Sequence, residues 1–270
     1  MNTEDRIKLF VGVDPNGCDA ESQMVLEYTA KKNSSLPVDI TWMQHSNNPE
    51  SIWSNWRSET WATPFSGFRW GIPAACNYEG QAIYMDSDMI ILGDLAELWR
   101  EPWNDTAIIQ MKGDWRTCVA KWHCARAGKV LPAITDIKNV PNAHQQLFTA
   151  LQHNPGLTQV FDRQWNNFDG ENDKLQDIKI LHYTDMSTQM HLQYAIPRLA
   201  SEGRKHWYDG DIRAHRRGDV QKLFDTMYME AKKEGYTPEQ YYDLNELVDY
   251  KKESQAGYKS NNGYDVTQGQ

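Results

Sequence analysis

The chain has 270 residues and a formal net charge of -9. This acidic balance argues against general nucleic-acid binding, which depends on clustered Lys and Arg. No apolar run approaches the ~18 residues of a membrane-spanning helix, and the start, MNTEDRIKLF, lacks the basic and apolar segments of a signal peptide. The four cysteines form no Cys-x-x-Cys pair, so neither a zinc ribbon nor a disulfide framework is indicated. We expect a cytoplasmic protein with reduced cysteines.

The hydrophobic pattern predicts strands that alternate with helices, which is typical of an α/β domain. In chain order, the expected elements are a strand at 7–13, a helix at 21–32, a strand at 38–43, a loop leading into a helix at 61–75, strands at 82–86, 89–92 and 107–111, and helices at 143–152, 220–233 and 238–250. Asp94, followed three residues later by Glu97, predicts a helix N-cap with a capping box. We expect a main domain at 1–215, a helical extension at 216–250 and a polar, disordered tail at 251–270.

The most informative motif is an Asp-x-Asp at the end of a predicted strand, formed by Asp86 and Asp88 in AIYMDSDMIILGDLAELW. Side chains alternate along a strand, so both carboxylates lie on one side of the backbone. Two carboxylates this close repel each other unless a cation lies between them. Hard divalent ions such as Mn2+ and Mg2+ bind carboxylate oxygen and nucleotide phosphates. The motif therefore predicts a metal site, the alternative being two surface turn residues.

The stretch YMDSDMIILGDLAELW resembles the Asp-x-Asp region of family 8 glycosyltransferases, retaining enzymes with the GT-A fold that include glycogenin and bacterial galactosyltransferases. Upstream, TPFSGFRWGIP is similar to a family segment in which an Arg, here Arg69, follows a Ser or Tyr by three residues. Downstream, IKILHY resembles the family's late His-Tyr motif, here His182 and Tyr183. The resemblance extends over roughly residues 6–190.

This resemblance implies one Rossmann-like nucleotide-diphospho-sugar transferase domain with a mixed central sheet and C-terminal helices. It implies a retaining hexosyltransferase that uses a nucleotide-sugar, first of all a UDP-sugar, a carbohydrate or other hydroxyl acceptor, and Mn2+ or Mg2+. The implied metal ligands are Asp86, Asp88 and His182. The implied donor contacts are Asp14, Arg69, Asp86 and Ser87, and the catalytic candidates are Arg69, Asp169 and Gln189.

Several of these residues have plainer interpretations. Asp14 either contacts the nucleoside at a strand end or accepts hydrogen bonds within a turn. Arg69 either contacts the donor or forms a salt bridge beneath a loop. His182 is a ligand or a hydrogen-bonded core histidine. No carboxylate is singled out as a nucleophile, which favours front-face transfer guided by the leaving phosphate over double displacement. Asp169 and Gln189 are then positioning groups.

The chain departs from the family pattern after the His-Tyr motif, where better-known members carry a Lys that reaches the donor diphosphate. Here the sequence continues TDMSTQMH, without Lys. A phosphate contact is expected instead from Thr188, Gln189 or Arg198. The segments 117–124 and 165–170 lie where the family has its Asn-x-Gly and Asp-Gln motifs. A basic-leaning patch, either an anion site or a solvated connector, is formed by His191, His206, Arg213, His215, Arg216 and Arg217.

Tryptophan is frequent, with 11 residues, and flat indole rings suit contact with a sugar. For most of the cluster at Trp53, Trp56, Trp61 and Trp70 we expect core packing, with one or two rings lining an acceptor cleft.

Other classes of protein fit the sequence less well than a glycosyltransferase. A haloacid-dehalogenase-type phosphatase needs a downstream Lys and acidic pair, and a nucleotidyltransferase of the nucleotide-sugar pyrophosphorylase type needs a basic Gly-rich loop after the first strand. A non-catalytic carbohydrate-binding protein stays open.

Overall fold

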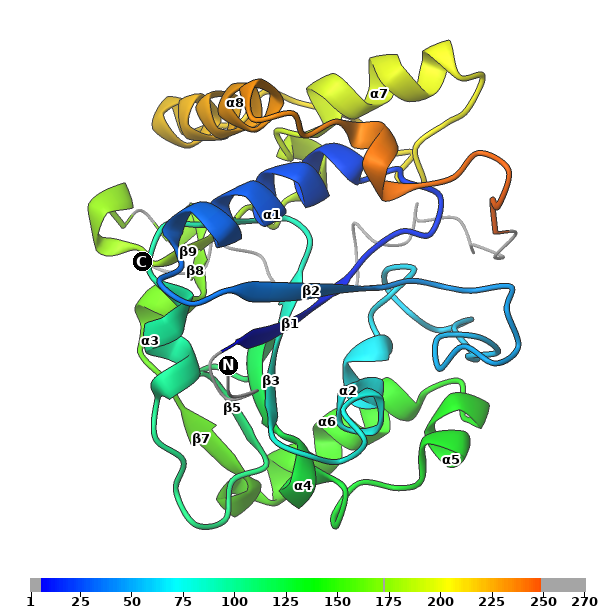
Figure 1. The fold of residues 1–270 in the computed structure, drawn as a ribbon, viewed down its shortest axis with the longest axis vertical. Coiled ribbons are helices and arrows are strands. Elements are labelled where there is room, and N and C mark those ends of the chain that lie inside the picture. Colours follow the sequence, from blue (N-terminus) through cyan, green and yellow to red (C-terminus); the bar gives the residue numbers. More distant parts are fainter. Residues whose placement is uncertain (1–5, 172, 249–270) are drawn as a thin grey trace.

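The structure is a computed structural model that describes residues 6–171 and 173–248. At its centre lies a six-stranded sheet with the strand order β2-β1-β3-β6-β5-β7 (Figure 1). β1 is parallel to β2 and β3, β6 is antiparallel to β3 and β5, and β7 is parallel to β5, so the sheet is mixed as predicted. The strands are β1 (Ile7–Gly12), β2 (Val38–Met43), β3 (Gln81–Asp86), β5 (Ile109–Lys112), β6 (Arg116–His123) and β7 (Thr158–Val160).

A second, three-stranded sheet has the order β4-β9-β8. Its strands are β4 (Met89–Ile91), β8 (Asn167–Phe168) and β9 (Ile180–His182). β4 begins just after the Asp-x-Asp motif and pairs antiparallel with β9, with Met89 opposite His182. The small sheet therefore holds the late histidine beside the acidic turn.

Both faces of the central strands are covered, which explains why β1 and β3 are rich in apolar residues. On β1, Leu9 and Val11 pack into one cluster together with Met85 of β3. Phe10 points to the opposite face and packs with Tyr84. The alternation along β3 continues into the acidic turn, so Tyr84 and Asp86 share a face.

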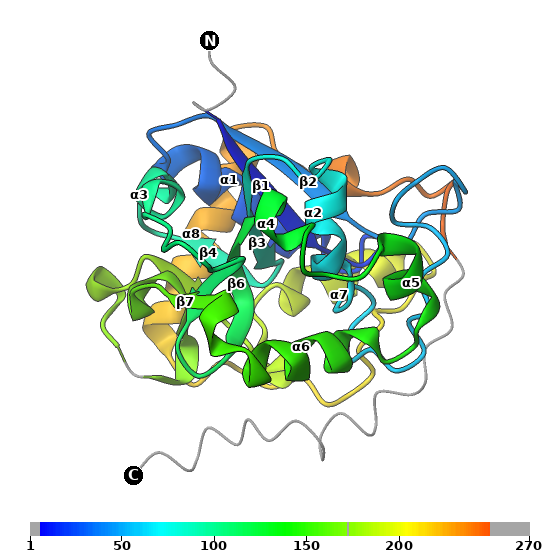
Figure 2. The same cartoon turned by 90° about the horizontal axis from the view of Figure 1, so that it is seen from below.

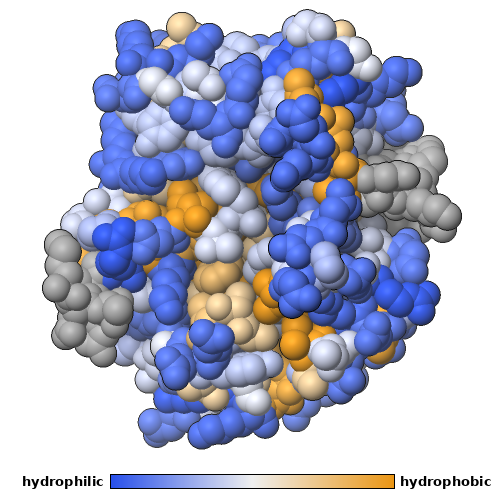
Figure 3. Space-filling model, turned by 45° about the vertical axis from the view of Figure 1, so that its right-hand side comes forward, coloured by the Kyte–Doolittle hydropathy of each residue, from blue (hydrophilic) through white to orange (hydrophobic). Residues whose placement is uncertain are grey.

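The helices form layers on the two sides of the sheet. They are α1 (Ala20–Asn33), α2 (Ile72–Ala75), α3 (Leu95–Arg100), α4 (Cys124–Ala127), α5 (Ile134–Asn139), α6 (Ala143–His153), α7 (Leu192–Ser201) and α8 (Gly218–Lys233). α8 packs against α1 on one side, and α5 and α6 lie on the other (Figure 2). Within the described residues, no helix is both long and apolar enough to cross a membrane. Hydrophilic residues cover most of the face shown in Figure 3.

Most of the predicted elements are present, but two details were wrong. Asp94 does cap α3 by accepting from the Ala96 N–H, yet the Glu97 carboxylate binds Lys179 instead of completing a capping box. The helix expected at 238–250 is only a 3-10 turn, η8 (Pro238–Tyr241). It ends because the Asp243 carboxylate accepts from the Asn245 N–H, a local bond that competes with helix formation. The expected tail lies outside the described residues.

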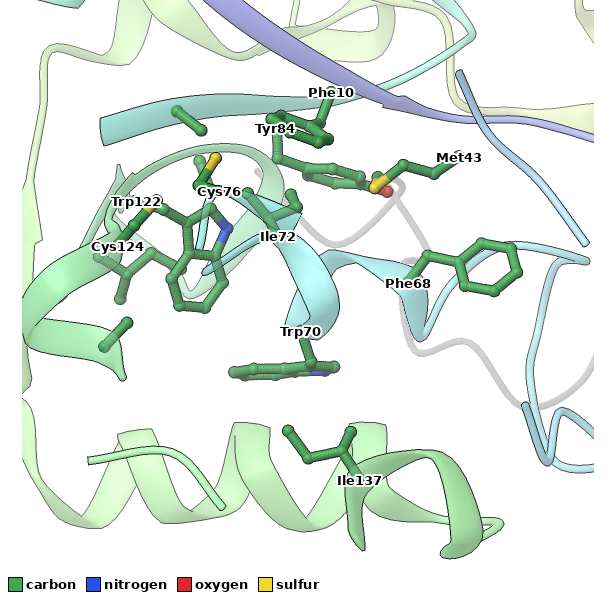
Figure 4. Close-up of a cluster of buried hydrophobic side chains, with 14 of the residues drawn as sticks. Phe10, Met43, Phe68, Trp70, Ile72, Cys76, Tyr84, Trp122, Cys124 and Ile137 are labelled. Carbon is green, nitrogen blue, oxygen red and sulfur yellow. The ribbon is translucent and has the colours of Figure 1, made fainter. Parts of the chain in front are cut away.

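The tryptophan cluster is mainly part of the core, as expected. Trp53, Trp56 and Trp70 are 9%, 7% and 2% exposed. Trp61 is only partly buried and packs edge-on against Phe68, with ring centroids 5.1 Å apart. Figure 4 shows the Trp70 ring lying flat between α2 and the helices below it. Trp61 is thus the least buried member of this cluster.

A buried lysine caps the C-terminal end of α3 through hydrogen bonds to backbone carbonyls. Lys121 on β6 is 0% exposed, and its Nζ donates to the carbonyls of Leu98, Trp99 and Glu101 at 3.3, 3.2 and 2.6 Å. We expect Lys121→Met to lower the free energy of unfolding by about 2–4 kcal/mol, because these carbonyls lose their donor. Urea unfolding measures this loss, and the exposed control Lys129→Met should change it by less than about 0.5 kcal/mol. Equal stability of the two variants would contradict the assignment.

Candidate active site

The candidate site lies where the parallel strands β1 and β3 end. Gly12 is paired with Asp86 in the sheet, so the loop after β1, which carries Asp14, begins beside the acidic turn. His182 arrives from the small sheet through its pairing with Met89. Ligands of open α/β sheets bind at this carboxyl edge of the strands.

Asp86, Asp88 and His182 form a compact group. One ligand atom of each lies within 4.8 Å of the other two. His182 Nε2 is 3.1 Å from Asp88 Oδ1, and the side chains of His182 and Asp88 are 6% and 18% exposed. The structure therefore brings together the three residues that the sequence singled out as metal ligands.

Asp86 is held by two donors on the same carboxylate oxygen. The Tyr84 hydroxyl donates to Asp86 Oδ1, and Arg69 Nη2 donates to the same atom at 3.2 Å. Burial raises the pKa of Asp86, the Arg69 guanidinium opposes this rise, and the Asp88 carboxylate adds to it. Burial also raises the pKa of Tyr84 well above its ordinary value, so the hydroxyl keeps its proton. Because both donors use Oδ1, Oδ2 is the oxygen that can face a cation.

Arg69 is buried and braces this arrangement. Its Nε donates to Ser66 O at 3.0 Å, and its Nη1 donates to the carbonyl and the hydroxyl of Thr117, both at 2.9 Å. The guanidinium also lies over the Tyr84 ring, 4.5 Å from the centroid. Arg69 thus ties the 3-10 turn η2 (Phe68–Gly71) and β6 to Asp86. This geometry favours a positioning role, close to the plainer of the two sequence interpretations.

Gln189 braces the second carboxylate. It follows the 3-10 turn η7 (Met186–Thr188) in the loop after β9. Its Nε2 donates to Asp88 Oδ2 at 2.7 Å and to Tyr183 O at 3.2 Å. The amide donor is therefore directed at a candidate metal ligand.

His182 balances the charge of the two carboxylates. Burial lowers its pKa, but the Asp88 carboxylate more than compensates, so that the pKa of His182 lies well above its ordinary value. A proton on this ring supplies positive charge beside two partly buried carboxylates. Two carboxylate oxygens and one imidazole nitrogen are also a donor set that suits Mn2+, whereas Mg2+ prefers oxygen alone. The residues present therefore fit a divalent cation.

Cation binding should release the His182 proton. Imidazole binds a metal only in its neutral form, and the raised pKa of His182 means that a proton competes with the metal for the ring. The apparent affinity for Mn2+ should therefore increase by up to about tenfold per pH unit until the pH passes that pKa. Calorimetric titrations in buffers with different heats of ionisation count the released proton. An affinity that does not change between pH 6 and pH 8 would contradict this linkage.

Asp14 and Ser87, two of the expected donor contacts, have their side chains turned inward. Asp14 is buried, and its Oδ1 accepts from the backbone N–H groups of Asn16 and Cys18 at 2.9 and 3.1 Å. These bonds are those of a turn acceptor, the plainer of its two interpretations. Ser87 lies between the two carboxylates and is 3% exposed.

Asp169 lies next to the metal-ligand group but is paired with another residue. It follows β8, whose Phe168 is paired with His182 in the small sheet, and the two rings meet edge-on at 5.1 Å. The Asp169 carboxylate lies 2.7 Å from His215 Nε2. This hydrogen bond raises the pKa of His215, so the contact favours the protonated form of the ring.

Two of the residues expected as phosphate contacts, Arg198 and Thr188, make hydrogen bonds within the protein. Arg198 donates to the Glu21 carboxylate at 2.6 and 3.0 Å and to Gly17 O at 2.7 Å, so it braces the start of α1. The Thr188 hydroxyl donates to Asp185 O at 3.2 Å. These contacts make neither side chain a ready phosphate ligand.

Sequence reasoning missed a second polar group, centred on Asp19. His191 Nε2 and His206 Nε2 lie 3.2 and 3.0 Å from Asp19 Oδ1, and Trp207 Nε1 donates to Oδ2 at 2.9 Å. Asp19, His191 and His206 have metal-ligand spacing too. However, the Tyr208 N–H donates to His206 Nδ1 at 2.9 Å, which leaves the ring proton on Nε2, facing Asp19. A protonated nitrogen cannot bind a metal, so this group is a hydrogen-bonded clasp.

Comparison with known proteins places this geometry in a fold class. No protein-family model matches the chain. It is 32% identical to Protein CDI of Arabidopsis thaliana over 92 residues, a stretch that covers 34% of this chain and 35% of that protein. The aligned stretch thus spans about a third of that relative's length.

Solved glycosyltransferases share the architecture. The galactosyltransferase LgtC, in complex with donor and acceptor sugar analogues, has a TM-score of 0.53 at 9% identity, covering 89% of this chain and 100% of that one. GlyE of Streptococcus pneumoniae has a TM-score of 0.53 at 13% identity, covering 92% and 67%. The bifunctional glycosyltransferase WbbM has 0.52 at 12% identity, and the match spans 86% of this chain but 52% of WbbM. The chain therefore has the GT-A glycosyltransferase fold, and the resemblance to family 8 enzymes is confirmed at the level of the fold.

Proposed function

We propose that the protein is a metal-dependent glycosyltransferase that moves a hexose from a UDP-sugar to a carbohydrate or other hydroxyl acceptor with retention of configuration. The observation that carries this proposal is the convergence of Asp86, Asp88 and His182 at the ligand-binding edge of a GT-A sheet. The likeness to LgtC, whose structure contains donor and acceptor sugar analogues, supports the reaction class.

The residues of the site have two proposed roles: some bind the metal, and others position the metal ligands. Asp86, Asp88 and His182 would hold Mn2+, or Mg2+, which when bound offsets the negative charge that develops on the leaving diphosphate. Arg69 fixes Asp86 and Gln189 fixes Asp88 through the hydrogen bonds described above. Ligands held in this way need little rearrangement when the donor arrives, which lowers the barrier to transfer.

The hydrogen bond between Asp169 and His215 is consistent with retention by front-face transfer. The Asp169 carboxylate follows β8, whose Phe168 is paired with His182, and it is engaged by His215 at 2.7 Å. A carboxylate that already accepts a hydrogen bond is a weaker nucleophile, because the bond stabilises its charged ground state. Asp169 then positions the sugar or the segment that carries His215.

Asp14 and Ser87 are proposed to line the nucleoside end of the donor site with their backbone.

The C-terminal residues described here are proposed to cover the catalytic domain of residues 1–215. Val220 and Phe224 of α8 are buried in the same hydrophobic cluster as Ala20 and Met24 of α1. The extension at 216–250 therefore shares a core with the first helix of the domain, and we expect its removal to unfold α1.

Release of UDP from a panel of UDP-sugars, measured with and without Mn2+, tests the proposed function. We expect release that depends on the metal and increases when simple sugars are supplied as acceptors. A thermal shift with UDP-sugar and Mn2+ measures binding separately, since a bound donor stabilises the folded state by mass action. Stabilisation without release would identify a binding protein, and neither effect would refute the proposal.

A further inference from the structure

A segment between α7 and α8 crosses the carboxylate-rich edge of the sheet and is fastened at both ends. We call residues 206–215 the strap. At one end, His206 Nε2 lies 3.0 Å from Asp19 Oδ1. At the other end, His215 Nε2 lies 2.7 Å from Asp169 Oδ2. Two buried carboxylates thus fix the course of the strap past the candidate site.

Between these two clasps the strap carries Arg213 to the loop that braces Asp88. The Arg213 N–H donates to Ser187 O at 2.6 Å, and its Nη2 donates to the Ser187 hydroxyl at 3.0 Å. Ser187 Oγ itself donates to Asp185 Oδ1 at 2.7 Å, which directs its lone pairs toward the guanidinium. Ser187 is two residues before Gln189, whose amide binds Asp88 at 2.7 Å. Arg213 is therefore anchored to the same loop that braces Asp88.

The charges around the site favour an additional cation, and Arg213 can supply it. Arg69 is buried and paired with Asp86, Arg198 is partly buried and paired with Glu21, and Arg217 is paired with Asp219. Arg213 is exposed, and among the described residues it makes no ion pair. An anionic ligand that approaches Asp86 and Asp88 meets like charge, so it gains from a cation other than the metal.

We propose that Arg213 binds the diphosphate of the nucleotide-sugar donor, a role that rests on the proposed function. A guanidinium presents parallel N–H groups that match two phosphate oxygens, and one hydrogen bond to Ser187 leaves most of these donors directed outward. The Ser187 contact fixes the side chain before the donor arrives, which lowers the entropic cost of binding. The strap, with its two clasps, serves to hold this residue in place.

The test compares binding of UDP with binding of uridine, both in the presence of Mn2+, because these probes differ only in the diphosphate. We expect Arg213→Ala to weaken UDP binding by about tenfold to a hundredfold and to change uridine binding by less than about twofold. Arg213→Lys should restore part of the loss, since an ammonium keeps the charge but not the fork. The matched control is Arg216→Ala, which removes an equal charge from an exposed position three residues away. It should leave both affinities within about twofold.

Three outcomes would overturn the proposal: unchanged UDP binding in Arg213→Ala, equal losses for UDP and uridine, or equal losses in Arg213→Ala and Arg216→Ala. Equal losses in Arg213→Ala and Arg216→Ala would show that these arginines act only through their combined charge. Failure of the proposed function gives a different result, because wild-type protein would then bind neither UDP nor a UDP-sugar with Mn2+. A wild-type chain that binds UDP with Arg213 uninvolved keeps the function and removes only this assignment.

Discussion

Asp88→Ala is expected to lower Mn2+-dependent release of UDP by about a thousandfold or more, a loss of about 4 kcal/mol of transition-state stabilisation. The carboxylate is at once a proposed ligand and the partner of His182 and Gln189. Without it, His182 loses the charge that raises its pKa, and the Gln189 amide loses its acceptor. Steady-state kinetics over a range of Mn2+ concentrations measure the loss, and calorimetry should detect no Mn2+-dependent binding of UDP-sugar.

Asp94→Ala is the matched control for this variant. It also removes a carboxylate from the stretch after β3, but Asp94 caps α3 and binds the Ser35 N–H away from the site. Loss of a cap costs about 1 kcal/mol of stability, so this variant should melt earlier and yet keep its dependence on Mn2+. If Asp88→Ala keeps full Mn2+ dependence, the metal site has been placed wrongly.

The parts of the site that could be predicted are those set by local pattern. The apolar pattern before Asp86 identified β3, and the apolar run before His182 marks β9. Pairing of β4 with β9 then brings the histidine to the acids. These residues act from strand ends, where periodicity in the sequence and position in the fold are closely linked.

The parts that could not be predicted depend on contacts between distant segments. β6 was not recognised as a strand, because Lys121 interrupts its apolar pattern with a charge that is satisfied only by the end of α3. As a result, Thr117 was not seen as the partner of Arg69. The Asp19 clasp joins residues that are 172 and 187 positions apart. No periodicity or spacing in the sequence marks such a group.

Arg69→Ala is expected to reduce activity through Asp86. The sequence analysis left Arg69 as a donor contact with a catalytic role or as a salt bridge beneath a loop. In the structure, the guanidinium is 8% exposed and donates to Ser66, Thr117 and Asp86. Removing one partner of a buried ion pair typically costs about 3–5 kcal/mol, so we expect a loss of stability of this size in urea unfolding. Arg69→Lys should recover only part, because one ammonium cannot serve all of these acceptors.

The dependence of activity on pH separates the two roles of Arg69. Arg69 lowers the pKa of Asp86 against the effect of burial, so in Arg69→Ala that pKa should rise and Asp86 should stay protonated to higher pH. The acid limb of the pH profile should therefore move to higher pH, and the apparent affinity for Mn2+ should fall. High pH and saturating Mn2+ should then restore most of kcat. If kcat stays low at every pH and Mn2+ concentration while the variant remains folded, the guanidinium acts directly on the charge that develops as the glycosidic bond breaks.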